Sequence, residues 1–275
     1  MERALQQPRR DAMRIGLIAP PWIPVPPPAY GGTEAVVDNL ARGLTELGHE
    51  VSLFTVASST CPVRLLSLFD DAVEPLGQTV PEVAHVLAAY EELQDVDIIH
   101  DHTVLGPLVA TRYGVGGPPV VTTNHGPFTA VTVPIFREIA RTARVVAISH
   151  DQATRALDVP IAAVILHGID LDTYYVGPGD DERLVFLGRM SPDKGVVEAV
   201  RIAHAARRPL HIVSKMREPE ECAYFEDCVK PLLSHQEDEV MELGLEDRVR
   251  LLGRAAGLLN PIAWPEPFGL VMEIG

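Results

Sequence analysis

Short apolar runs alternate with amphipathic segments along almost the whole chain, and this alternation limits the folds open to it. In the first half, segments with the character of β-strands are separated by segments with the period of a helix. The expected strands cover residues 14–20, 50–55, 98–100, 119–125, 145–149 and 162–167. The expected helices cover residues 33–48, 81–93, 104–112, 134–141 and 150–157. Strands and helices alternating at this spacing predict βαβ units, and therefore a parallel sheet with helices on both faces.

The same alternation restarts in the second half of the chain. The expected strands cover residues 184–190, 210–214, 240–243 and 258–262, and the expected helices cover residues 196–207, 219–233 and 245–254. Residues 169–181 contain glycine, proline and acidic residues without an apolar period, which is typical of a linker between domains. The predicted organisation is a loose tail over residues 1–13, a doubly wound α/β domain over 14–168, a linker over 169–183 and a second α/β domain over 184–275.

Composition bounds the class of protein. At 275 residues, with 47% apolar and 22% charged residues, the chain is large enough for two domains with separate cores. The formal net charge of −15 argues against a general nucleic-acid binder, because such proteins neutralise phosphates with a basic surface. Any bound phosphate must therefore be held by a local site.

Cysteine content and apolar run length bear on the cellular location. Cys61, Cys222 and Cys228 have no metal-ligand spacing, and an odd number of cysteines makes a poor disulfide framework. No apolar run approaches the roughly 18 residues of a membrane span, and residues 1–11 lack the apolar centre of a signal peptide. We expect a cytoplasmic protein without a transmembrane segment, either free or peripheral to the membrane, with Met13 as an alternative start.

A compact basic turn follows the expected strand over residues 184–190. It places Arg189 and Lys194 together at the carboxyl end of a parallel strand, where open α/β sheets bind ligands. A planar guanidinium and a flexible ammonium beside a helix start suit a diphosphate. The turn therefore predicts the anion clamp of a nucleotide-sugar site. The alternative is a surface turn with solvated charges.

Two glycines precede the first expected helix. Gly31 and Gly32 would let backbone N–H groups approach a ligand without an intervening side chain, and Thr33 is a suitable N-cap residue. The alternative is a plain loop before a helix. Residues 24–28, just upstream, are rich in proline. An alternative interpretation of these residues is a polyproline segment that binds another protein.

Several motifs together resemble one enzyme family. A Pro-Glu-x-Phe-Gly turn spans Pro265 to Gly269 and opens a helix, as in the signature of retaining glycosyltransferases of family 4. Further motifs that resemble this family follow in the same order, namely Gly31-Gly32, Asn124-His125-Gly126, Ala147-Ile148-Ser149, His167-Gly168-Ile169-Asp170 and Gly188-Arg189 to Lys194-Gly195. The similarity covers residues 14–275. The chain resembles a member truncated at its C-terminus, because the family usually continues well past this helix.

The resemblance implies the GT-B fold, in which two Rossmann-like domains face a cleft, with the acceptor mainly on the first and the nucleotide-sugar on the second. It implies transfer of a hexose from a UDP- or GDP-sugar to a hydroxyl of a glycan, a lipid or a small molecule, with retention of anomeric configuration. It implies no metal ion and no cofactor. The alternative, from another class, is a nucleotide-sugar-binding protein without transferase activity.

The resemblance also assigns roles to individual residues. Arg189 and Lys194 would hold the diphosphate, and the amides of Gly31 and Gly32 would close on it from the other domain. Glu266 would bind sugar hydroxyls and act in catalysis, because a carboxylate accepts two charge-assisted hydrogen bonds at once.

Four further positions are assigned in the same way. His125 would act as a catalytic residue near the transferred sugar, with a structural turn histidine as the alternative. Phe268, Gly269 and Glu273 would meet the donor sugar or its ribose.

One position departs from the family pattern. The family has seven residues between its two glutamates, whereas six separate Glu266 from Glu273, so that Ile274 occupies the expected position. Either the turn before the helix tightens and restores the ribose contact, or the contact is lost. The prolines on both sides of Glu266 stiffen the turn, so we expect the loss.

Some acidic and histidine residues have the spacing of metal ligands. His100 and His102 flank Asp101 at a strand end, and Asp95-Val96-Asp97 and Asp170-Leu171-Asp172 match the Asp-x-Asp motif that binds manganese in the other large glycosyltransferase fold. The surrounding domain has no other sign of that fold. We therefore expect ordinary loop residues at these positions and no metal site.

Overall fold

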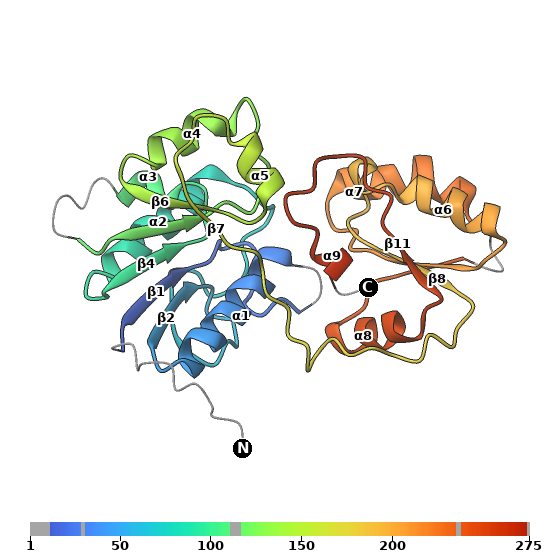
Figure 1. The fold of residues 1–275 in the computed structure, drawn as a ribbon, viewed down its shortest axis with the longest axis horizontal. Helices are drawn as coiled ribbons and strands as arrows, with labels where there is room; N and C mark the ends of the chain where they lie inside the picture. Colours follow the sequence, from blue (N-terminus) through green and yellow to red (C-terminus); the bar gives the residue numbers. More distant parts are fainter. Residues whose placement is uncertain (1–11, 29–30, 111–116, 235–237, 274–275) are drawn as a thin grey trace, which may run out of the picture.

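A computed structural model of the protein describes residues 12–28, 31–110, 117–234 and 238–273. Within this part, the strands form two separate sheets, one of seven strands and one of four, and all of their strand pairs are parallel. The two sheets and their helices make two lobes that lie side by side (Figure 1). The predicted α/β fold with two Rossmann-like sheets is therefore confirmed.

The first sheet has the strand order β3-β2-β1-β4-β5-β6-β7. Its strands are β1 (Arg14–Ile18), β2 (Glu50–Thr55), β3 (Arg64–Ser67), β4 (Ile98–Asp101), β5 (Val120–Thr123), β6 (Ala143–Ala147) and β7 (Ile161–Val164). Its helices are α1 (Gly32–Glu46), α2 (Thr79–Glu92), α3 (Gly106–Val109), α4 (Thr132–Ile139) and α5 (His150–Arg155). Two apolar clusters cover the two faces, one around Leu17 and Val37 and one around Phe54 and Phe136. The strand order changes direction between β1 and β4, which opens a crevice at their carboxyl ends.

The second sheet has the strand order β10-β9-β8-β11 and changes direction between β8 and β11. Its strands are β8 (Leu184–Leu187), β9 (Leu210–Val213), β10 (Glu239–Met241) and β11 (Gly257–Leu259). Its helices are α6 (Val196–Ala206), α7 (Pro219–Tyr224), α8 (Leu245–Arg254) and α9 (Leu270–Glu273). The core between α6 and the sheet contains Phe186, Val200 and Ile212, whereas the cluster on the other face has three buried members among the described residues, Val185, Leu187 and Val213. One face of this lobe is therefore thinly covered.

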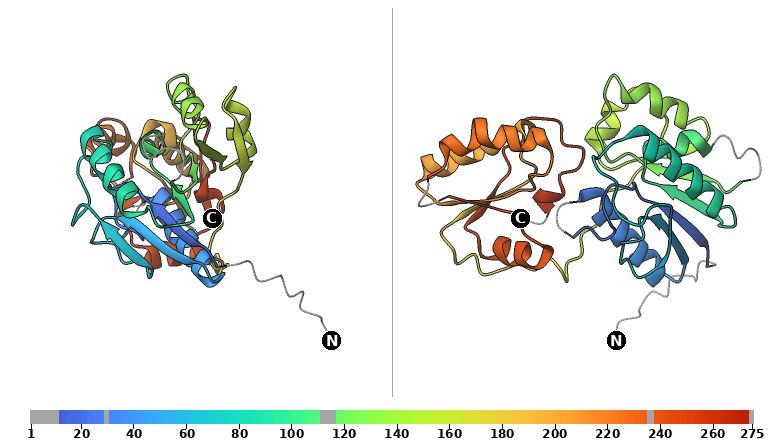
Figure 2. Two further views of the ribbon diagram at one scale, coloured as in Figure 1. Left: turned by 90° about the vertical axis from the view of Figure 1, so that its left-hand side faces the viewer. Right: turned by 180° about the vertical axis from the view of Figure 1, so that it is seen from behind.

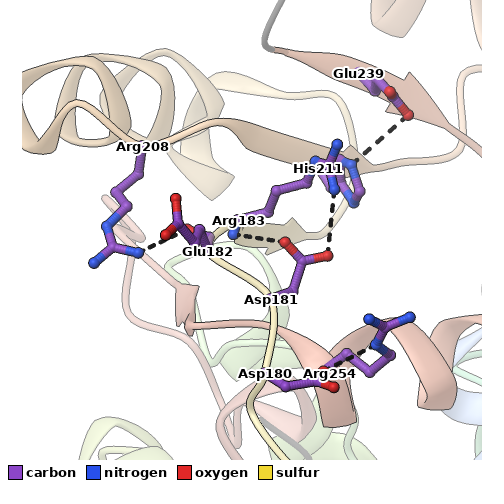
Figure 3. Close-up of polar contacts among 8 residues, drawn as sticks. All are labelled: Asp180, Asp181, Glu182, Arg183, Arg208, His211, Glu239 and Arg254. Atoms are coloured by element: carbon purple, nitrogen blue, oxygen red, sulfur yellow. Dashed lines mark hydrogen bonds and ion pairs between the residues drawn. The ribbon is translucent and has the colours of Figure 1, made fainter.

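The segment between the lobes is attached to the second one at its C-terminal end. The backbone N–H of Gly179 donates to the carbonyl of Gly253 at 3.0 Å, and that of Asp181 donates to the carbonyl of Arg254 at 2.8 Å. The side chains of Asp180 and Arg254 form an ion pair at 3.0 Å (Figure 3). These contacts fix residues 179–181 along the end of α8. The boundaries of the linker and of the two domains stay predictions.

The structure corrects three local expectations. Helix α1 begins at Gly32 with Gly31 at the N-cap position, so Thr33 is not the N-cap. Residues 57–77, which no pattern assigned, contain the edge strand β3, whose partial burial leaves no clear apolar alternation. The helix expected over residues 219–233 is α-helical only to Tyr224 and continues as a π turn and a 3₁₀ turn, because Pro231 has no N–H to donate.

Two expectations fall partly outside the described residues. Helix α3 ends at Val109, and the predicted continuation to residue 112 lies in the range 111–116, which the structure does not describe. The predicted tail over residues 1–13 is described only at residues 12 and 13. Within the described ranges, no helix is long and apolar enough to cross a bilayer.

Candidate functional site

A pocket of about 530 Å³ lies between the two lobes, at the carboxyl ends of both sheets. The view from behind shows α1 and α9 facing each other across the gap between the lobes (Figure 2). An aromatic contact crosses from one lobe to the other, since the rings of His167 and Phe268 lie 4.9 Å apart. The pocket is therefore walled by both halves of the chain.

The structure brings almost all of the predicted site residues to this pocket. Its lining includes Gly31, Gly32, His125, Arg189, Lys194, Glu266, Phe268 and Gly269. The remaining predicted residue, Glu273, ends α9, and its side chain and Ile274 lie outside the described part of the chain. The sequence motifs therefore identify residues that line the pocket, while the roles of these residues stay predictions.

The basic turn after β8 is held by the loop that follows β11. Residues 192–194 form one 3₁₀ turn, and Gly195 then adopts a left-handed conformation with φ of 77°. A Cβ at Gly195 would lie 2.0 Å from the carbonyl oxygen of Pro261, so a side chain does not fit there. This close packing fixes Lys194 toward the pocket, whereas Arg189 remains 43% exposed and contacts Asp193 at 3.4 Å.

Lys194 and Glu266 form an ion pair that the sequence did not suggest. Lys194 Nζ donates to Glu266 Oε2 at 2.5 Å, and the two side chains are only 13% and 19% exposed. Trp264 Nε1–H donates to the same oxygen at 2.8 Å, and Lys194 Nζ lies 4.9 Å from the centre of the Trp264 ring. The predicted phosphate binder and the predicted sugar binder therefore bind each other in this structure.

The first lobe contributes a row of histidines that leads to the pocket. The ring centres of His100 and His102 lie 4.2 Å apart, those of His102 and His125 lie 5.1 Å apart, and those of His125 and His167 lie 5.2 Å apart. Burial lowers the pKa of His100 and of His167 to about 4 and that of His125 to about 3. The rings of this row are therefore neutral at pH 7.

Several further charged residues line the pocket without having been singled out by the sequence, and Glu34 and Lys215 are among the most buried of them. Glu34, in the first turn of α1, is buried, and burial raises the pKa of its carboxyl to about 7, although the charge of Lys215 counteracts the shift. Lys215 follows β9 and is only 8% exposed. Its place just beyond the carboxyl end of a parallel strand is a signal that could have identified it.

The positions with metal-ligand spacing have other partners. Asp97 pairs with Arg14 at 2.8 Å near the amino ends of β1 and β4, at the opposite end of the sheet from the pocket. Asp170 accepts hydrogen bonds from the Asp172 N–H and the Thr173 hydroxyl, which close its own turn. No cluster of three or more histidine, cysteine or acidic residues is arranged for a metal ion within the described residues.

Two parallel sheets whose carboxyl ends face one pocket define the GT-B fold of glycosyltransferases. Residues 30–173 match the sequence profile of Glycosyltransferase Family 4, and this range is just over half of the chain. The chain belongs to that family. A search of curated proteins finds no match.

Solved structures agree with this fold. AviGT4, a glycosyltransferase involved in avilamycin A biosynthesis, is 26% identical with a TM-score of 0.69, over 94% of this chain and 75% of AviGT4. Anabaena Alr3699/HepE in complex with UDP and glucose is 16% identical with a TM-score of 0.69, over 94% of this chain and 77% of HepE. The G117R mutant of S. aureus TarM is 10% identical with a TM-score of 0.65, over 94% of this chain and 83% of TarM.

Proposed function

We propose that this protein transfers a hexose from a nucleoside diphosphate sugar, with UDP or GDP as the nucleotide, to an acceptor hydroxyl, with retention of anomeric configuration and without a metal ion. The observation that carries this proposal is one pocket in which Arg189 and Lys194 of the second lobe face Gly31, Gly32 and His125 of the first. The HepE structure with UDP and glucose, and a TarM structure with UDP and α-GlcNAc-glycerol, support a nucleotide-sugar as the ligand.

The diphosphate would lie between the two lobes. Arg189 and Lys194 would supply charge-assisted hydrogen bonds to its oxygens. The first N–H groups of α1, a helix of 15 residues, lack partners within the helix and carry its positive dipole end, so they suit the same anion. These groups would stabilise the negative charge that develops as the diphosphate departs.

The transfer itself exchanges two bonds at the anomeric carbon. The bond from this carbon to the diphosphate oxygen breaks, and a bond from the acceptor oxygen forms on the same face of the sugar. The acceptor proton passes to the departing diphosphate, so no side chain needs to end with an extra proton. Glu266 would fix the sugar through its hydroxyls, and His125 would face the sugar from the first lobe.

A donor panel tests the proposal. The chain is incubated with UDP- and GDP-hexoses and a panel of glycan, lipid and small-molecule acceptors, and released nucleotide and glycosylated product are both quantified. We expect turnover with at least one donor, retained activity in EDTA, and strong loss in Arg189→Ala. Tight donor binding without any product would instead favour a nucleotide-sugar-binding protein. Loss in EDTA with recovery on manganese would contradict transfer without a metal ion.

The ribose contact is a separate part of the proposal. We propose that Glu273 does not serve the donor, because Ile274 occupies the position of the family's second glutamate. Glu273→Gln should then change donor affinity much less than Glu266→Gln does. Equal losses in calorimetric titrations would show that Glu273 binds the ribose despite its shifted position.

A further inference from the structure

His125, which lines the pocket together with His167, is hydrogen bonded to a second, buried histidine. His102 Nδ1 lies 2.9 Å from His125 Nε2. His102 follows β4 and is 5% exposed, whereas His125 follows β5 and lines the pocket. His125 Nε2 is thus engaged by the protein, and Nδ1 is the ring nitrogen that remains for a ligand.

The protonation state of this pair is fixed by its surroundings. Burial, followed by the neighbouring His100, His125 and His167, lowers the pKa of His102 well below its usual value, and burial lowers that of His125 to about 3. Each ring is therefore neutral and has a single N–H. In a hydrogen bond between two neutral imidazoles, one ring donates its N–H and the other accepts with a lone pair.

The second ring nitrogen of His102, Nε2, indicates which of the two rings donates the hydrogen bond. Its Nε2 is fully buried and has no hydrogen-bond partner among the described residues. If this nitrogen had the proton, a buried N–H would be left unpaired, which is rarer in folded proteins than an unpaired acceptor. The proton of His102 is therefore on Nδ1, which donates to His125 Nε2. His125 must then have its own proton on Nδ1.

We propose that His102 is a positioning residue that holds His125 in the Nδ1–H tautomer, so that His125 presents a hydrogen-bond donor to an oxygen of the ligand. The proposal assigns His125 the role of a donor and not of a base. It deepens the proposed function, in which the acceptor proton leaves with the diphosphate. His100 is not part of this pair, because its Nε2 lies 2.8 Å from the hydroxyl oxygen of Thr123 and makes no bond to His125.

Nitrogen NMR tests the tautomer without any turnover. The protein is labelled with ¹⁵N-histidine, and long-range ¹H–¹⁵N correlations at pH 7 report which nitrogen of each ring is protonated. His125 is assigned by its loss in His125→Gln. We expect a protonated Nδ1 and an unprotonated Nε2 on His125. The opposite pattern in the parent protein overturns the proposal, whether or not the protein transfers a sugar.

Three variants, two at His102 and one at His100, test the role of His102. His102→Phe keeps a ring but removes the donor, so we expect His125 to lose its single tautomer. His102→Asn keeps a short N–H donor and should restore the parental pattern. His100→Phe is the matched control, because it removes a partly buried imidazole that does not bond to His125, and it should leave the tautomer unchanged. An unchanged tautomer in a folded His102→Phe variant overturns the proposal.

Kinetics add a second readout once a donor is known. His102→Phe should lower kcat on the order of tenfold to a hundredfold, because a misplaced donor loses stabilisation of the transition state. The Kd of the nucleotide alone should change less than about twofold, because its proposed partners are on other elements. His102→Asn should recover most of the kcat. Equal losses in Asn and Phe variants would show that His102 only packs. If His102→Phe does not fold, the NMR measurement of the His125 tautomer in the parent protein still tests the proposal.

Discussion

Glu266→Gln should strengthen binding of the free nucleotide diphosphate while it weakens recognition of the sugar. The carboxylate of Glu266 is the anion that Lys194 binds in the structure, at 2.5 Å and with both side chains largely buried. A diphosphate must compete with this carboxylate for the ammonium group. Glutamine keeps the shape of the side chain but removes the competing charge.

The size of the effect follows from the geometry of the pair. Two unit charges about 4 Å apart interact by about 4 kcal/mol at an effective dielectric constant of 20, and a hydrogen bond to a charged group has a net value of about 1.5–3 kcal/mol. The glutamine still accepts a neutral hydrogen bond from Lys194, which offsets part of this. We therefore expect UDP or GDP to bind more tightly by about 1–2 kcal/mol, or roughly 5- to 30-fold.

The sugar-containing donor should respond differently. Its sugar hydroxyls lose the proposed charge-assisted bonds to Glu266, at a cost of about 1.5–3 kcal/mol that exceeds the gain of about 1–2 kcal/mol at the diphosphate, so the donor binds more weakly than to the parent protein. Isothermal titration calorimetry with nucleotide and with nucleotide-sugar separates the two effects. The preference for the sugar-containing donor over the free nucleotide should fall by about tenfold or more.

Two further variants complete the test. In Lys194→Met, the additional Glu266→Gln change should no longer tighten nucleotide binding, because the competition has been removed. Glu198→Gln is the matched control, since Glu198 lies on α6 outside the pocket, pairs with Arg201 at 3.8 Å and loses the same charge. If Glu266→Gln weakens UDP and UDP-sugar equally, Glu266 only holds Lys194 in place and the reasoning is refuted.

Three other predictions address the clamp, the histidines and the second lobe. Arg189→Ala and Lys194→Ala should each weaken nucleotide-sugar binding by about one to several kcal/mol in calorimetric titrations, and parental affinity in both would show that the clamp is misassigned. Burial lowers the pKa of His125 to about 3, so its ring stays neutral at every pH above that value. The plot of kcat against pH should therefore show no titration of His125 between pH 5.5 and 8. A titration near pH 6.5 that His125→Gln removes would contradict this. In hydrogen exchange, the segment after residue 258 should open before the strands of the first lobe, because the described part of α9 has only four residues; equal protection throughout would contradict this.

The periodicity of apolar residues in the sequence predicts most of the helices and strands. The bounds of β2 and α8 coincide with the predicted ranges, because each element has a continuous buried run or a clear amphipathic stripe between turn residues. The edge strand β3 was not recognised, since an edge position leaves its side chains only partly buried. The turns after α7 were predicted as regular helix because the apolar period continues past Tyr224 to Leu233.

The composition of the site was predictable, but its internal contacts were not. Arg189 and Glu266 were found because each has a motif of its own. The bond between Lys194 and Glu266 joins residues 72 positions apart, and the His102–His125 pair joins residues 23 positions apart. Such pairs depend on how strand ends and loops meet in space, which no local pattern encodes.

The stereochemical outcome of the reaction tests the central claim most directly. The chain is incubated with an α-linked nucleotide-hexose and an accepted hydroxyl compound, and proton NMR follows the anomeric signals of donor and product. The account predicts an α-linked product with one nucleotide diphosphate released per glycoside formed, and loss of both signals in Arg189→Ala. A β-linked product, or release of nucleotide without a glycoside, would contradict it.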